Sequence, residues 1–136
     1  MDLCSIVSHY AAEINWWWFA AATIVSFAIG GVWYSLLFSK AWIRVFKVEM
    51  EGVTTASVVR TMLFQLLTTM FLGAVFFVLT NISVWIAILT LVGICGWEKG
   101  KLNFQFSRRK DFLMAVVIEV GHTFVVGMVF ILFALL

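Results

Sequence analysis

The sequence predicts an all-α integral membrane protein that folds as a single four-helix transmembrane bundle over residues 1–136. The chain is 64% hydrophobic and only 12% charged, and its mean hydropathy is +1.09, values that ordinary water-soluble domains do not reach. Several stretches without acidic or basic residues are also long enough to cross about 30 Å of hydrocarbon, which takes roughly 20 residues of helix. These two observations carry the prediction.

The first predicted crossing covers residues 15–38, which hold no Asp, Glu, Lys or Arg. Three consecutive tryptophans at 16–18 suit the aromatic belt at the outer membrane interface. Further along, Ala22, Ser26 and Gly30 recur every four residues and form a stripe of small side chains. Such a stripe lets a second helix pack closely inside a membrane.

A short amphipathic helix is predicted near residues 40–51, directly after the first crossing. Four charged residues recur there at intervals of four, three and four, namely Lys40, Arg44, Lys47 and Glu51. They share one helical face, while apolar residues such as Trp42 occupy the rest, so the segment should lie in the membrane interface. A docking helix for a soluble partner, or a gating element coupled to the second crossing, is the functional alternative.

The second and third crossings are predicted from one charge-free run between Thr61 and Trp97. At 1.5 Å per residue this run would extend about 55 Å as one helix, which is too long for a single crossing. We therefore predict a helical hairpin with crossings near 60–80 and 83–98. The turn-favouring and capping residues at 80–83 mark the break between them.

The fourth predicted crossing covers residues 112–136, where Glu119 is the only acidic or basic residue. Three residues further on, His122 shares its helical face and comes within hydrogen-bonding reach. An ionisable pair inside a membrane costs at least a few kcal/mol, so it is a functional-site hypothesis by default. Counting from the charged flanks places Tyr34, Ser35 and Gln65 at similar depth.

These five residues, Glu119, His122, Gln65, Tyr34 and Ser35, form the candidate intramembrane polar site. Two interpretations of it stay open. In one, Glu119 and His122 exchange protons or bind a ligand. In the other, a protonated Glu119 bridges to Gln65 or Tyr34 and only holds helices together.

The distribution of basic residues predicts the orientation in the membrane. All nine lie in the connections after the first and third crossings: Lys40, Arg44, Lys47, Arg60, Lys99, Lys101, Arg108, Arg109 and Lys110. By the positive-inside rule both connections face the cytoplasm and both termini lie outside, in a multipass protein of the cytoplasmic or inner cell membrane. The predicted interfacial anchors are Trp42, Lys40, Arg44, Lys47, Arg108, Arg109 and Lys110. Such spread charge does not indicate nucleic-acid binding.

No metal, cofactor or catalytic residue is predicted. The spacing of Glu119 and His122 also occurs in helical di-iron sites, but those need a second such pair and two further carboxylates, which this chain lacks. The two cysteines, Cys4 and Cys95, have no metal-binding or redox spacing.

The segment from Gly30 to Trp42, GGVWYSLLFSKAW, resembles the signature of a bacterial membrane family called domain of unknown function 1761. In that family the first helix ends in Gly-x-x-Trp-Tyr-Ser-Pro-x-x-Phe-Gly-x-x-Trp. The segment 97–101 and the Gly121-His122 step are similar to its weaker, later features, whereas Leu36 and Ser39 replace its proline and second glycine. The resemblance implies a small four-helix membrane protein and brings no assigned activity with it.

Two functions remain open at this stage. The first is a homo-oligomeric binding or permeation protein that moves a proton, ion or small molecule past Glu119 and His122. The alternative is an accessory structural subunit of a larger membrane complex, held through the small-residue stripe and the interfacial helix. An enzyme acting on a lipidic substrate is less favoured, because the arginine-rich and asparagine-containing motifs of small four-helix membrane enzymes are missing. The expected surroundings are the lipid bilayer and further copies of the chain.

Overall fold

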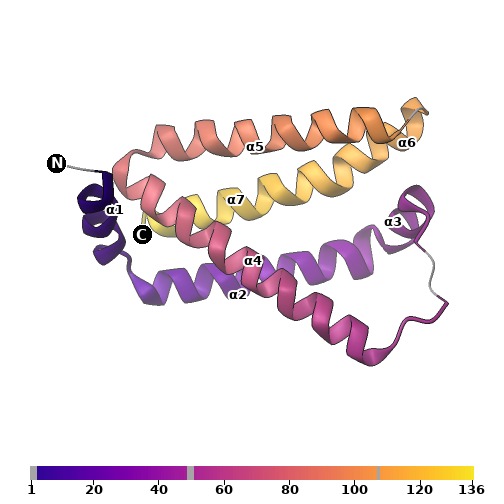
Figure 1. Cartoon of the computed structure of the whole chain (residues 1–136), viewed down its shortest axis with the longest axis horizontal. Coiled ribbons are helices and arrows are strands. Elements are labelled where there is room, and N and C mark those ends of the chain that lie inside the picture. The colour runs from indigo at the N-terminus through magenta and orange to yellow at the C-terminus, as the bar shows by residue number, and fades with distance from the viewer. Residues whose placement is uncertain (1–2, 49–50, 107) are drawn as a thin grey trace.

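A computed structural model describes residues 3–48, 51–106 and 108–136, and every regular element within these ranges is a helix. The all-α prediction is therefore confirmed. In chain order the elements are α1 (Leu3–Ala12), α2 (Trp16–Val32), the π-helical segment η1 (Trp33–Leu37), α3 (Ser39–Phe46), α4 (Thr55–Ile82), α5 (Val84–Gln105), α6 (Arg109–Ala115), the π-helical segment η2 (Val116–Val120) and α7 (Gly121–Ala134) (Figure 1).

Three continuous helical stretches in the described residues are long and apolar enough to cross a membrane: Trp16–Leu37, Thr55–Ile82 and Arg109–Ala134. They match the first, second and fourth predicted crossings. In α5, the longest stretch without a charged residue runs from Val84 to Trp97, and it extends about 21 Å along the helix axis. The crossing expected near 83–98 therefore stays a prediction, and with it the count of four.

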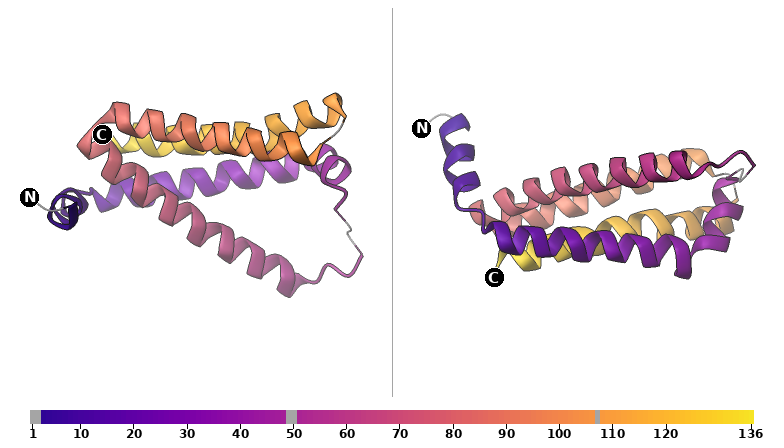
Figure 2. Two further views of the ribbon diagram at one scale, coloured as in Figure 1. Left: turned by 45° about the horizontal axis from the view of Figure 1, so that its top comes forward. Right: turned by 90° about the horizontal axis from the view of Figure 1, so that it is seen from below.

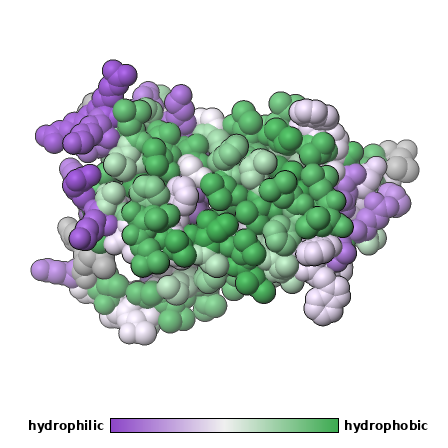
Figure 3. Space-filling view, turned by 180° about the vertical axis from the view of Figure 1, so that it is seen from behind, coloured by the Kyte–Doolittle hydropathy of each residue, from purple (hydrophilic) through white to green (hydrophobic). Residues whose placement is uncertain are grey.

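Hydrophobic side chains cover the middle of the molecule, as a membrane protein requires (Figure 3). Hydrophilic side chains gather mainly at one end, on the left of Figure 3, which is the end that carries α3 and α6. The predicted anchors Lys40, Arg44, Lys47 and Arg108–Lys110 are all exposed. The end of α7 and the whole of α1 lie at the opposite end, where α1 stands across the bundle (Figure 2).

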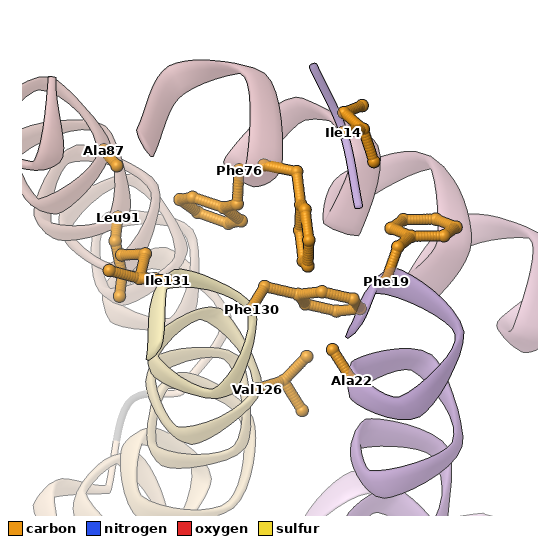
Figure 4. Close-up of a cluster of buried hydrophobic side chains, with 10 residues drawn as sticks. Ile14, Phe19, Ala22, Phe76, Ala87, Leu91, Val126, Phe130 and Ile131 are labelled. Carbon is orange, nitrogen blue, oxygen red and sulfur yellow. The ribbon is translucent and has the colours of Figure 1, made fainter. Parts of the chain in front are cut away.

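Helix α7 is the central element, because it packs against α2, α4 and α5. The main core lies where these four helices meet (Figure 4). Its fully buried aromatic residues are Phe76, Phe77 and Phe130, and Phe19 lies edge-on to Phe77 with ring centroids 5.4 Å apart. Gly73 allows α4 to approach α7, since a Cβ atom there would lie 2.3 Å from Cε1 of Phe130.

Only the second half of α4 takes part in this core. Five of its residues are buried: Thr69, Gly73, Phe76, Phe77 and Thr80. Between Thr55 and Thr68, by contrast, no side chain is buried. Figures 1 and 2 show why: α4 crosses α2 obliquely, and its Thr55 end diverges from the other helices.

The helix boundaries around α4 follow local capping chemistry. Thr54 caps α4 in a reciprocal capping box with Ser57, as residues of this type do at helix starts. The predicted break is also found, because α4 ends at Ile82 and α5 begins at Val84, with extended Ser83 between them. At its far end, α5 runs through Glu98 to Gln105, beyond the end expected near residue 98.

The interfacial helix is shorter than predicted. Instead of running to residue 51, α3 ends at Phe46, because Lys47 adopts the left-handed conformation (φ 51°) that closes a helix. Residues 49–50 of the expected helix lie outside the described residues. The apolar face of α3 also packs within the protein, since Val45 is buried in a second core with Leu102 and Ala115.

Candidate functional site

A cavity of about 360 Å³ lies between the α2–η1 stretch, α4 and the start of α7. It occupies the region where the exposed half of α4 diverges from α2, and we call it the α2/α4 cavity. Four of the five candidate residues line it: Tyr34, Gln65, Glu119 and His122. They reach it from three different helical stretches, so the fold brings together residues that are far apart in the sequence.

An aromatic cluster surrounds His122 on the α2 side. The Tyr34 ring lies edge-on to the imidazole with centroids 5.0 Å apart, and the Trp33 ring lies 6.1 Å away. Two glycines make room for these contacts. A Cβ atom at Gly30 would lie 3.2 Å from Nε2 of His122, and one at Gly121 would lie 3.2 Å from the Trp33 ring.

Trp33 also ties the two π-helical segments together. Its indole N–H donates a hydrogen bond of 2.8 Å to the carbonyl oxygen of Ile118, across a separation of 85 residues. Tyr34 belongs to η1 and Glu119 to η2, so both candidate residues sit on π-helical turns. Single π-helical turns inside α-helices occur frequently at functional sites.

Glu119 and Tyr34 interact electrostatically, and both line the α2/α4 cavity. Glu119 also lines a second cavity of about 350 Å³, bounded by α5 and Phe46, which we call the α5 cavity. Lys101 and Glu98 line this second cavity as well. Glu119 is thus the side chain that the two cavities share.

Glu98 contributes a second carboxylate close to Glu119. One of its oxygens, Oε1, accepts a hydrogen bond of 3.2 Å from the Thr123 hydroxyl. The other oxygen, Oε2, is buried and has no hydrogen-bond partner among the described residues. Lys101 is the cation that acts electrostatically on both Glu98 and Glu119.

Three further buried polar atoms have no hydrogen-bond partner within the described part of the chain: Oγ1 of Thr80 in α4, Nε2 of His122 and Oγ of Ser26. His122 is only 9% exposed and Ser26 only 2%, and both line the α2/α4 cavity. Leaving a buried polar atom without a partner costs about 1–3 kcal/mol, so each such atom in a native structure calls for an explanation. The His122 and Ser26 atoms both lie behind the cavity wall, and Nε2 of His122 faces Gly30.

Ser35 is the candidate that the structure places away from the others. It is exposed, and its hydroxyl donates to the carbonyl oxygen of Gly31 on the same helix. Gln65 lines the cavity but is exposed on α4, across the gap from Glu119. The polar cluster around Glu119 therefore includes Tyr34 and excludes Ser35.

The predicted stripe and one predicted anchor also contribute to the cavity. Ala22 is fully buried in the core, whereas Ser26 and Gly30 line the cavity wall. Trp42, expected as an interfacial anchor, lines the cavity too, with its ring centroid 6.2 Å from that of Tyr34. The sequence carried a signal that Tyr34 shares a wall with Ser26 and Gly30, because Tyr34 follows Gly30 by the same four-residue step that links the stripe.

For Trp33 the sequence offered only its place in the Gly-x-x-Trp-Tyr-Ser signature, and nothing in it indicated that Thr123 donates to Glu98. No group of three or more His, Cys, Asp or Glu residues that could hold a metal ion is present in residues 3–48, 51–106 and 108–136.

Comparisons with protein-family models, with curated proteins and with solved structures found no match to this chain. The resemblance of the 30–42 segment to domain of unknown function 1761 therefore stays a prediction. What the structure adds is that the two segments carrying the resemblance, around Gly30 and Gly121, pack against each other through Trp33 and His122.

Proposed function

We propose that the protein is a binding and permeation protein of the cell membrane, in which Glu119 holds a proton, an ion or a small molecule in transit. The observation that carries this proposal is the position of Glu119, which lines both the α2/α4 cavity and the α5 cavity. A carboxyl group that can be reached from two sides is the minimum requirement for handing a solute from one side to the other. An intramembrane carboxylate that only stabilised helix packing would not need to line any cavity.

The charge distribution supports a direction for the two openings. The exposed residues Lys101 and Gln105 line the α5 cavity near the basic end of the molecule, which the positive-inside rule assigns to the cytoplasm. The α2/α4 cavity is instead lined by Thr61, Met62 and Gln65 of the exposed half of α4. In this proposal a proton reaches Glu119 through the α5 cavity, whereas an ion or a small molecule reaches Glu119 through the α2/α4 cavity.

An oligomer fits the same arrangement. The residues from Thr55 to Thr68 lack buried side chains within one copy of the chain, and α5 carries too short a charge-free stretch to cross unaided. Packing between copies would cover α4 and shield the polar end of α5. We therefore propose a homo-oligomer with four crossings per copy.

The accessory-subunit alternative loses its main support. It relied on the stripe of Ala22, Ser26 and Gly30 as a surface for another protein. In the structure Ala22 and Ser26 are buried, Gly30 faces His122, and α7 of the same chain packs against α2. A partner would have to use a different surface.

Flux into proteoliposomes that contain a pH-sensitive dye tests the proposal. We expect proton entry under an imposed pH gradient. We expect Glu119→Gln to reduce this entry by about tenfold or more, because the glutamine amide cannot take up and release a proton; a tenfold change corresponds to about 1.4 kcal/mol. Glu13→Gln is the matched control, because Glu13 is an exposed carboxylate whose one ion pair among the described residues is with His9 at the protein surface. Equal flux through the Glu119→Gln variant, or no flux from the unaltered protein under proton, sodium and potassium gradients, would refute the proposal.

A further inference from the structure

The lining of the α2/α4 cavity defines the chemical class of its ligand: we propose that it binds a lipophilic amine in its protonated form. This inference rests on the proposed function in one respect, namely that the cavity holds a small molecule. It goes further by specifying a cation with N–H donors and an apolar body. Four observations support this inference in turn: the charge of the cavity wall, its aromatic side chains, its unpartnered acceptors and the exposed side chains of α4 at its edge.

The charge of the cavity wall selects a cation. Among the described lining residues, Glu119 is the only Asp, Glu, Lys or Arg. The second carboxylate, Glu98, acts electrostatically on Glu119, and Lys101, the cation that acts on both carboxylates, lines the other cavity. An anionic ligand would meet Glu119 without any lysine or arginine in the wall to offset it, so it is disfavoured.

The aromatic side chains of the wall suit the same cation. Phe27, Tyr34 and Trp42 line the cavity, and Tyr34 lies edge-on to Trp42 with an interplanar angle of 74°. Tyrosine and tryptophan faces attract ammonium groups, and they do so more strongly where the pair is removed from water. A carboxylate beside such rings therefore favours an ammonium group over an uncharged ligand.

The unpartnered atoms distinguish an amine from a quaternary ammonium ion. Nε2 of His122 and Oγ of Ser26 are buried in the wall without hydrogen-bond partners among the described residues. A neutral imidazole that carries its proton on Nδ1 accepts at Nε2, and a hydroxyl oxygen also accepts. A primary ammonium group can donate to Glu119, and to His122 or Ser26 once that side chain turns toward the cavity, whereas a quaternary one has no N–H to donate.

The direction of the opening accounts for an apolar body. The cavity opens between α2 and α4, where Met62 lines it with a side chain that is 55% exposed. The neighbouring surface of α4 is made of exposed apolar side chains such as Leu63 and Phe64. An alkyl chain attached to the ammonium group can therefore extend from the cavity toward the lipid.

The experiment uses the full chain in nanodiscs, with isotope-labelled histidine and tyrosine observed by NMR. The sequence contains two residues of each type, and one of each lines the cavity: His122 with His9 as internal control, and Tyr34 with Tyr10. Octylamine is titrated against octanol and octyltrimethylammonium, which share its chain length. We expect octylamine to shift the His122 and Tyr34 signals saturably and to leave those of His9 and Tyr10 unchanged.

Two variants separate binding in the cavity from uptake into lipid. Glu119→Gln should weaken octylamine binding by about tenfold or more, because it removes a charge-assisted hydrogen bond. Gly31→Val should block binding by filling the cavity, and since a Cβ atom at Gly31 meets nothing within 4 Å, the fold has room for it. Gly93→Val is its matched control, with equally open space and a position outside the cavity.

Equal affinity for octanol and octylamine, or unchanged octylamine binding by both Glu119→Gln and Gly31→Val, would overturn the inference. Tighter binding of octyltrimethylammonium than of octylamine would also overturn it. These outcomes are distinct from failure of the proposed function. Proton flux without amine binding would remove the ligand class and leave permeation standing, whereas amine binding without any flux would support the ligand class and remove permeation.

Discussion

The approach of α4 to α7 at Gly73 leads to a prediction whose size follows from the structure. A Cβ atom on residue 73 would lie 2.3, 2.5 and 2.8 Å from three atoms of the Phe130 ring. Carbon atoms pack best at about 3.5–4.0 Å, so the ring or one helix would have to move by roughly 1 Å. Phe130 is fully buried, and its ring contacts those of Phe19 and Phe77, so it has no free volume to enter.

We therefore expect Gly73→Ala to destabilise the fold. Overpacking of this kind costs about 1–3 kcal/mol, while the higher helix propensity of alanine returns at most about 1 kcal/mol. Gly93→Ala is the control, because a Cβ atom there meets nothing within 4 Å and only the gain in propensity applies. The two variants should thus differ by about 2 kcal/mol in the free energy of unfolding.

Reversible unfolding in mixed micelles, with increasing sodium dodecyl sulfate and detection by circular dichroism, measures this difference. A second change, Phe130→Leu, removes the atoms that clash with residue 73. The loss caused by Gly73→Ala should therefore be smaller in a Phe130→Leu background. Equal stability of Gly73→Ala and Gly93→Ala would show that α4 and α7 do not approach at Gly73 as described.

Two further predictions concern single hydrogen bonds. Trp33→Phe removes the indole N–H that donates to the Ile118 carbonyl oxygen. The substitution should therefore lower the free energy of unfolding by about 1–3 kcal/mol in the same assay. A free energy unchanged within error would mean that this bond does not tie η1 to η2. Thr54→Ala removes the cap of α4 and should cost about 0.5–2 kcal/mol, visible as faster amide hydrogen exchange over the first turns of α4. Thr54→Ser, which keeps the hydroxyl, is its control and should restore slow exchange.

Much of the fold could be predicted because membranes impose simple rules. A helix in hydrocarbon must be long and nearly free of charge, so the run before Lys40 and the run after Asp111, where Glu119 is the only charged residue, identify two spanning helices directly. The break at Ser83 was also visible, since the run between Thr61 and Trp97 is too long for one crossing. The end of α3 was not, because the residue in the left-handed conformation that closes it is a lysine, Lys47, and not the glycine or asparagine that usually marks such an end.

The candidate site was predictable in part, for a reason that lies in helix geometry. Tyr34 and Gly30 are four residues apart, so their common face follows from the sequence, as does that of Glu119 and His122. The contact of Trp33 with Ile118 did not follow, because π-helical turns change the angular spacing of side chains and leave no mark in composition. Which helices converge on one cavity is likewise a property of tertiary packing.

The half-packed state of α4 has a mechanical consequence. With its second half held in the core from Thr69 onward, the first half acts as a lever about 21 Å long between Thr69 and Thr55. A tilt of about 10° at Thr69 would displace the Thr55 end by about 4 Å over that length. The angle of this one half-helix therefore sets how far the α4 wall of the α2/α4 cavity lies from α2, while the buried core stays as it is.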